Sequence, residues 1–191
     1  VKRGDLSVMI GGANSYNGIA GNAVSIGALA GSTNPPAEGT VSIGFNAGSG
    51  TSASVKSKSV QIGDSSNIGG SGIQAVAVGY NSNAGGDYSQ AVGVNAVATG
   101  ISAIAIGAGS RAVAVGAIGI GGRYNGGSTY GELGTKSIVI GDGTALNGAV
   151  EENAVVIGAS SALSGCGEDN VIIGAYANSS NSTDQAICLN A

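Results

Sequence analysis

The residues that could perform chemistry in this 191-residue sequence are few and scattered. No histidine is present, so the Ser–His and Cys–His pairs that commonly activate a nucleophile cannot form. Asp64, Asp142 and the Glu151–Glu152 pair fall in separate expected turns. The two glutamates could act as acid and base, but a solvated turn is the favoured interpretation. The sequence therefore predicts no catalytic residue, and a carbohydrate-active enzyme on a β-helix stays open as a minor alternative.

Candidate metal and cofactor sites are equally sparse. Cys166 and Cys188 are too few for a disulfide-dense scaffold or a four-thiolate zinc site. We expect free thiols, because Cys166 lies in a turn between two glycines whereas Cys188 lies in the last expected strand. The glycine-rich run 119–122 could suggest a phosphate-binding loop, but no helix is expected after it. We therefore expect neither a metal ion nor an organic cofactor.

Two segments could recognise a ligand. An Arg-Gly-Asp tripeptide near the N-terminus is of the integrin-binding type, although a short turn before the first strand would also favour glycine and aspartate. The longest insertion, between Gly121 and Gly141, carries tyrosine and arginine, which are favoured at binding hot spots. Its residues could instead fill a cleft between chains or be solvated. The candidate ligand-binding residues are Arg3, Gly4, Asp5, Arg123, Tyr124, Tyr130 and Glu132.

A single short repeat must position all of these residues. It reads aliphatic, any residue, aliphatic, glycine, and it occurs twelve times, with Asn190 in place of the last glycine. Its closing residues are 14 to 20 positions apart, so a fixed unit of 14 carries insertions in its turns. This pattern predicts a parallel β-solenoid of about twelve coils. We expect residues 1–191 to form one such domain. The copies close at Gly11, Gly27, Gly44, Gly63, Gly79, Gly93, Gly107, Gly121, Gly141, Gly158, Gly174 and Asn190.

Alternation along the strand assigns the repeat positions to two faces. The first and third positions share one face, and because that face is aliphatic we expect it to be buried inside each coil, as at Ile26, Ile43, Ile106 and Ile140. A second glycine often lies seven residues before the closing one, which predicts two corners and two short strands per coil. It occurs at Gly72, Gly86, Gly100, Gly134 and Gly167.

The middle position of the repeat should then point outward. It is small or polar in the early copies, as at Ser42, and aliphatic at Val139, Val156 and Ile172. Apolar residues on both faces of a strand indicate that both faces are buried. We therefore expect these late residues to pack against another chain. The alternative is a wider coil with a second internal layer.

Composition limits the classes of partner that can be expected. The chain is 9% charged with a net charge of −4 and has no basic stripe, so nucleic acid is not expected. No apolar run approaches the roughly 20 residues of a membrane span, so this segment should not insert into a membrane. Charged residues should lie only in turns, where water solvates them. The examples are Glu38, Lys56, Lys58, Asp87, Glu132, Glu151, Glu168 and Asp184.

The repeats resemble those of the head of trimeric autotransporter adhesins, the YadA-like head. The segments Ala75-Val76-Ala77-Val78-Gly79 and Ala103-Ile104-Ala105-Ile106-Gly107 carry the resemblance. It implies a left-handed β-roll and a side-by-side homotrimer. It also implies a non-enzymatic head or shaft of a fibre on the bacterial cell surface, attached to a host-surface protein or glycan. Surface fibres of phages and viruses use the same repeat, and the ending 186–191 is similar to theirs, so a virion fibre is the alternative.

Overall fold

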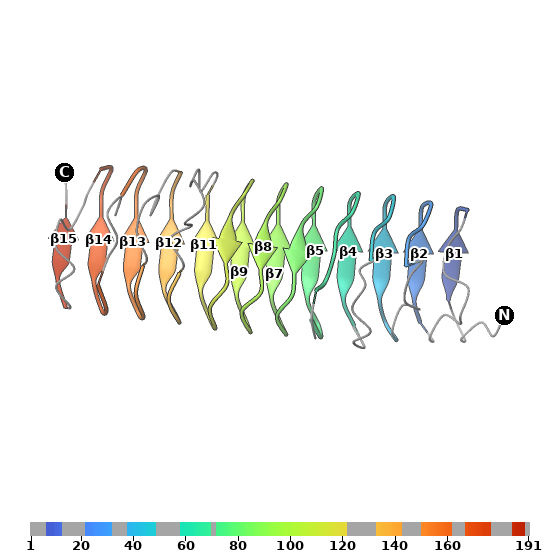
Figure 1. The fold of residues 1–191 in the computed structure, drawn as a ribbon, viewed down its shortest axis with the longest axis horizontal. Coiled ribbons are helices and arrows are strands. Elements are labelled where there is room, and N and C mark those ends of the chain that lie inside the picture. The colour runs from blue at the N-terminus through green and yellow to red at the C-terminus, as the bar shows by residue number, and fades with distance from the viewer. Residues whose placement is uncertain are drawn as a thin grey trace.

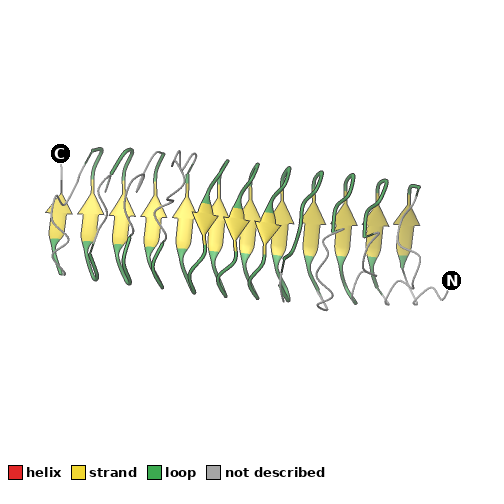
Figure 2. Ribbon diagram, in the orientation of Figure 1, coloured by secondary structure: helices red, strands yellow, loops and turns green. Residues whose placement is uncertain are grey.

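The molecule is an elongated solenoid of short parallel strands. The computed structural model describes residues 7–12, 22–31, 38–48, 58–69, 72–121, 133–142, 150–161, 167–176 and 185–189. Every regular element in these ranges is a β-strand of two or three residues. Figures 1 and 2 show the strands side by side in chain order from one end to the other. The predicted all-β solenoid is therefore confirmed.

The larger sheet follows the repeat. It contains twelve parallel strands in the order β1-β2-β3-β4-β5-β7-β9-β11-β12-β13-β14-β15. Equivalent repeat positions pair throughout, as Val76 with Gln90 and Gln90 with Ile104. The strands are β1 (Val8–Ile10), β2 (Val24–Ile26), β3 (Val41–Ile43), β4 (Val60–Ile62), β5 (Val76–Val78), β7 (Gln90–Val92), β9 (Ile104–Ile106), β11 (Ile118–Ile120), β12 (Ile138–Ile140), β13 (Val155–Ile157), β14 (Val171–Ile173) and β15 (Ile187–Leu189).

A second, smaller sheet closes the central coils from the opposite side. It consists of β6 (Asn83–Ala84), β8 (Val97–Ala98) and β10 (Arg111–Ala112), with β8 in the middle. Isolated bridges extend the same side of the solenoid, joining Asn67 to Asn83 and Leu133 to Val150. The prediction of two strands per coil is therefore confirmed for the central coils. Because the larger sheet keeps one register, residues beyond the minimal 14 come between its strands in the sequence.

The predicted inward face of the repeat is wrong. The middle residue of each copy points into the coil, whereas the first and third residues lie on the outside of the sheet. Ser42 is 1% exposed and Ala105 is fully buried, whereas Ile106 is 37% exposed. Ile26, Ile43 and Ile140, which were also expected inside, are only partly buried. The reason is the size of the coil, because the two facing strands of a 14-residue coil leave room for alanine between them but not for valine and isoleucine.

From the 14-residue coils onward, the size of the middle residue follows the length of the coil around it, whereas the longer early coils carry the small Ser25 and Ser42. Strands that border 14-residue coils carry Ala91, Ala105 or Gly119 at this position. The later coils are longer and carry Val139, Val156 and Ile172, which are all at most 1% exposed. These three side chains belong to the core of their own chain, so their expected packing against another chain is wrong. Larger inward residues thus fill these longer coils.

Buried serines complete this narrow core by binding the corner backbone. The hydroxyl of Ser89 donates to the carbonyl of Gly86 at 2.7 Å, and Ser137 donates to Gly134 at the same distance. Ser25 reaches across its coil to the carbonyl of Ala30 at 2.8 Å. A serine can therefore replace an inward alanine without leaving an unpaired polar atom.

Two kinds of left-handed residue turn the chain at the corners. The closing glycines have φ between 120° and 143°, and that of Gly93 is 137°. Non-glycine residues two positions before a strand or two positions after a closing glycine also have positive φ, as Lys58 and Asn95 do. Their backbone amides bond to the preceding coil, and the amide of Asn95 donates to the carbonyl of Tyr80 at 2.9 Å. Stacking therefore stabilises left-handed conformations that these residues would otherwise avoid.

The glycines expected at the second corner allow the backbone of the next coil to lie close to them. A Cβ on Gly86 or Gly100 would meet a backbone carbonyl of the next coil, and one on Gly134 would lie 2.5 Å from the carbonyl carbon of Glu151. Only Gly72 of the five expected glycines has a recorded positive φ. The prediction of corners with glycine is confirmed at these positions, with proximity of the next backbone as the cause.

We expect Ala105→Val to lower the free energy of unfolding by about 1–3 kcal/mol, because the added methyl groups overpack a core that is one alanine wide. The control is Ala108→Val, at an exposed corner three residues later, which should change stability by less than about 0.5 kcal/mol. Urea denaturation followed by circular dichroism measures both. Equal stability of the two variants would contradict the inward placement of Ala105.

Candidate functional site

The most extensive candidate surface is the outside of the larger sheet. It carries two columns of side chains, from the first and third positions of the twelve strands, which we call the outer ladder. All but Gln90 are valine, isoleucine or leucine. Ile62, Ile106 and Ile173 are between 37% and 40% exposed although they lie in the middle of a sheet. At about 4.8 Å per strand the ladder is roughly 50 Å long. No described residue of the chain covers it.

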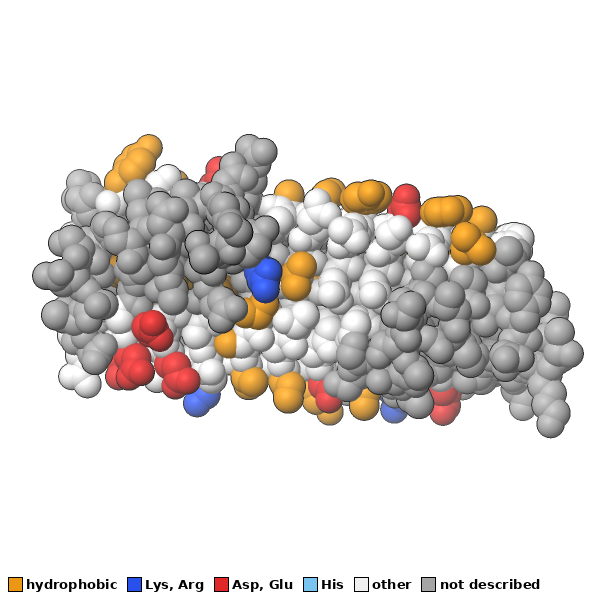
Figure 3. Space-filling model, in the orientation of Figure 1, with side chains coloured by type: hydrophobic (Ala, Val, Ile, Leu, Met, Phe, Trp, Pro, Cys, Tyr) orange, Lys and Arg blue, Asp and Glu red, His pale blue; other side chains and the backbone are white. Residues whose placement is uncertain are grey.

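Apolar residues continue around both long edges of this sheet. The lower edge, at the start of the strands in Figure 1, carries Tyr88 and Ile101, which are 56% and 51% exposed. The upper edge, at the end of the strands, carries Phe45, Tyr80 and Val94, which are 47% to 56% exposed. Figure 3 shows hydrophobic side chains along both long edges of the solenoid. A contiguous apolar surface of this extent marks an interaction site.

Charged side chains mostly follow the expected pattern. Glu38, Lys58, Glu151 and Glu168 lie in exposed turns or loops, and Asp87 lies in a partly buried turn. Lys56, Glu132 and Asp184 lie outside the described residues. The prediction that charge occurs only in turns is wrong at one position. Arg111 belongs to β10, where it points away from the core because the neighbouring Ala112 occupies the inward position.

A groove of about 400 Å³ lies on the second side of the solenoid. It follows the longest insertion directly, since Leu133 and Gly134 come just after that segment. Its wall combines apolar side chains with the two carboxylates that the sequence singled out. The lining residues are Ala114, Leu133, Gly134, Thr135, Val150, Glu151 and Glu152.

The groove places two carboxylates beside apolar side chains. Glu151 and Glu152 are both exposed, in line with a solvated turn. Within the described ranges, no three Cys, Asp or Glu side chains gather where they could hold a metal ion. Cys188 packs against the end of the core with a free thiol, and Cys166 lies outside the described residues.

The ligand-binding residues expected from the sequence lie outside the described part of the chain. These are Arg3, Gly4, Asp5, Arg123, Tyr124, Tyr130 and Glu132. Sequence reasoning also assigned the outer ladder to the core and so missed it as a surface. A signal was present: the middle residue is alanine or glycine at the 14-residue coils and larger in the longer coils that follow them, whereas the flanking positions stay aliphatic. Residues inside a coil must fit its width, and residues outside it need not.

Comparison with known families matches the central coils. The YadA head domain repeat matches twice, over residues 71–96 and 89–110, which include β5 to β9 and most of the minimal coils. Residues 71–110 are thus similar to the repeats of the YadA-like head of trimeric autotransporter adhesins. Comparison with curated proteins gives no match. None of the described residues forms a helix that is long and apolar enough to cross a membrane.

Proposed function

We propose, from the YadA head repeats and the outer ladder, that this chain is the head or shaft of a trimeric attachment fibre. It would act outside the cell, on the bacterial surface, without enzymatic activity. Residues 1–191 would form one left-handed β-roll domain. The observation that carries the proposal is the outer ladder, which no described residue covers, because a chain with such a surface needs a partner to cover it.

A closed ring of identical chains is the simplest partner. The ladder extends along the whole solenoid, so copies placed side by side around a common axis would cover it at every level. The YadA-like heads that share this repeat form trimers, which supports three as the number of chains. The two edges would add further apolar contacts, since Tyr80 and Tyr88 would lie beside neighbouring chains.

The second side of each chain would then face outward and contact the host. It bears the groove, so a trimer would present three copies of it. We propose that Arg123, Tyr124, Tyr130 and Glu132 contribute to binding a host-surface protein or glycan, with Arg3, Gly4 and Asp5 as a second contact. Three copies would raise weak single affinities through multivalency.

We expect Ile106→Asp to convert the trimer to monomer, because three carboxylates would enter an apolar interface. Thr99→Asp, on the exposed second side, should leave the trimer intact. Sedimentation equilibrium measures the assembly of both. Binding of each form to immobilised matrix proteins and glycans, at equal chain concentration, should be lost with the trimer. A wild-type chain that stays a folded monomer would overturn the proposal.

A further inference from the structure

Charges at the two edges of the larger sheet occur at matched positions. Lys58 lies two residues before β4, and Asp64 follows the closing glycine of the same strand. Lys136 and Asp142 occupy the same two positions around β12. All four side chains are exposed. In the other described coils these positions are uncharged, apart from Asp169 at the lower edge. Lysine at one edge therefore occurs only where aspartate is at the other.

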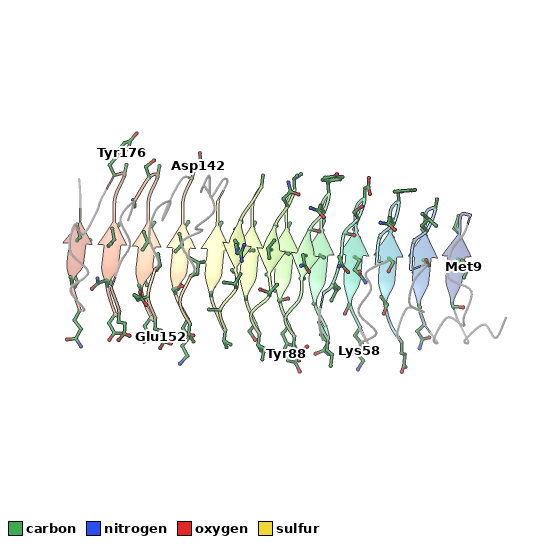
Figure 4. The ribbon with its side chains drawn as sticks, viewed as in Figure 1. Met9, Lys58, Tyr88, Asp142, Glu152 and Tyr176 are labelled. Atoms are coloured by element: carbon green, nitrogen blue, oxygen red, sulfur yellow. The ribbon has the colours of Figure 1, made fainter. Side chains whose placement is uncertain are left out.

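The lysine and aspartate of one coil cannot pair with each other. They lie at opposite ends of a strand, six residues apart, which at about 3.3 Å per residue is up to about 20 Å. Figure 4 shows Lys58 at the lower edge and Asp142 at the upper edge of the sheet. The two charges therefore do not pair with each other within one chain. Each has another neighbour there, because the backbone amide of Lys58 donates to the carbonyl of Glu38 at 2.9 Å and Asp64 Oδ1 accepts from the hydroxyl of Ser65 at 2.7 Å.

We propose that Lys58 pairs with Asp64, and Lys136 with Asp142, between neighbouring chains, and that these pairs fix a parallel, in-register assembly. This inference rests on the proposed function, which supplies the ring of chains. When ladders face a common axis and the solenoids run parallel, the lower edge of one chain meets the upper edge of the next at the same level. Every lysine then meets an aspartate. Tyr88 would likewise meet Val94.

Other arrangements lose or reverse these contacts. β4 is the fourth strand from one end of the larger sheet and β12 is the fourth from the other end. A face-to-face antiparallel pair related by an axis along the strands would therefore place Lys58 against Lys136 and Asp64 against Asp142. A slip of one coil, about 4.8 Å, would place Lys58 opposite Phe45 or Tyr80 instead. Like-charge contact disfavours wrong partners and registers.

Cysteine cross-linking tests the register in the full chain. The pair Lys58→Cys with Asp64→Cys is introduced where Cys166→Ser and Cys188→Ala remove the native thiols. Mild oxidation should give a covalent trimer on a denaturing gel. The matched control pairs Lys58→Cys with Asp142→Cys, which lie five strands or about 24 Å apart in level, and it should give none. Cross-linking between Lys58→Cys and Lys136→Cys would indicate antiparallel chains and overturn the inference.

Charge reversal tests the pairs with the native cysteines in place. Lys58→Asp and Asp64→Lys alone should each raise the concentration of half-dissociation about tenfold, because three exposed pairs are lost at once. The double variant should recover the wild-type value, and mixing the two single variants should form mixed trimers in preference to pure ones. Glu38→Gln, beside Lys58 in the same chain, should change little. If none of these substitutions changes the concentration of half-dissociation, the pairs are overturned and the proposed function stands. A monomeric wild-type chain would overturn both.

Discussion

Replacing Val156 with aspartate should unfold the chain, whereas the same replacement at Val155 should separate folded chains. Val156 is fully buried as the middle residue of β13, while Val155 belongs to the outer ladder and is half-buried. A carboxylate without a partner inside a coil costs about 3–5 kcal/mol, which is a large part of the stability of a small domain. At Val155 the carboxylate stays in water until chains associate.

Circular dichroism and sedimentation separate the two outcomes. The Val156→Asp variant should lose its β-sheet signal or show a strongly reduced urea midpoint. The Val155→Asp variant should keep the signal of a folded coil and sediment as a monomer. The reverse result, with Val155→Asp unfolded and Val156→Asp merely dissociated, would restore the inward face that the hydrophobic pattern suggested.

Gly93→Ala should destabilise the solenoid by roughly 2–6 kcal/mol. The φ of Gly93 is 137°, a conformation that costs other residues about 1–3 kcal/mol. A Cβ there would also lie 2.5 Å from the carbonyl oxygen and 2.6 Å from the carbonyl carbon of Gly107 in the next coil. Both atoms belong to a backbone stacked on both sides, so relief requires neighbouring coils to separate, at a cost similar to overpacking.

The matched control is Gly12→Ala. A Cβ at Gly12 would have no atom within 4 Å, and no positive φ is recorded for that residue. Its replacement should change the urea midpoint little, whereas that of Gly93 should lower it clearly. Similar urea midpoints for the two variants would show that neither the positive φ nor the close contact requires glycine at the closing position.

The binding residues expected from the sequence mark the limit of what motifs can establish. Tyr124 and Tyr130 were chosen by residue type, and a residue type gives no position in space. The outer ladder, in contrast, is visible in the sequence as twelve aliphatic pairs, but its meaning depends on which side of the strand is inside. The Lys58 and Asp64 pattern is also in the sequence, and it gains significance only from the strand register that places both residues at edges of one sheet.

The sequence by itself determined the repeat, the parallel stacking and the number of coils, because a closing glycine recurs wherever the chain must pass close to the next backbone. It also determined that insertions lie outside the strands. Only the tertiary structure decided the inward face. In a three-residue strand, one central side chain opposes two flanking ones, and hydrophobicity alone favours burying the aliphatic pair. The width of a 14-residue coil overrides this preference, since alanine fits between its walls and isoleucine does not, so the most apolar side chains are left on the surface.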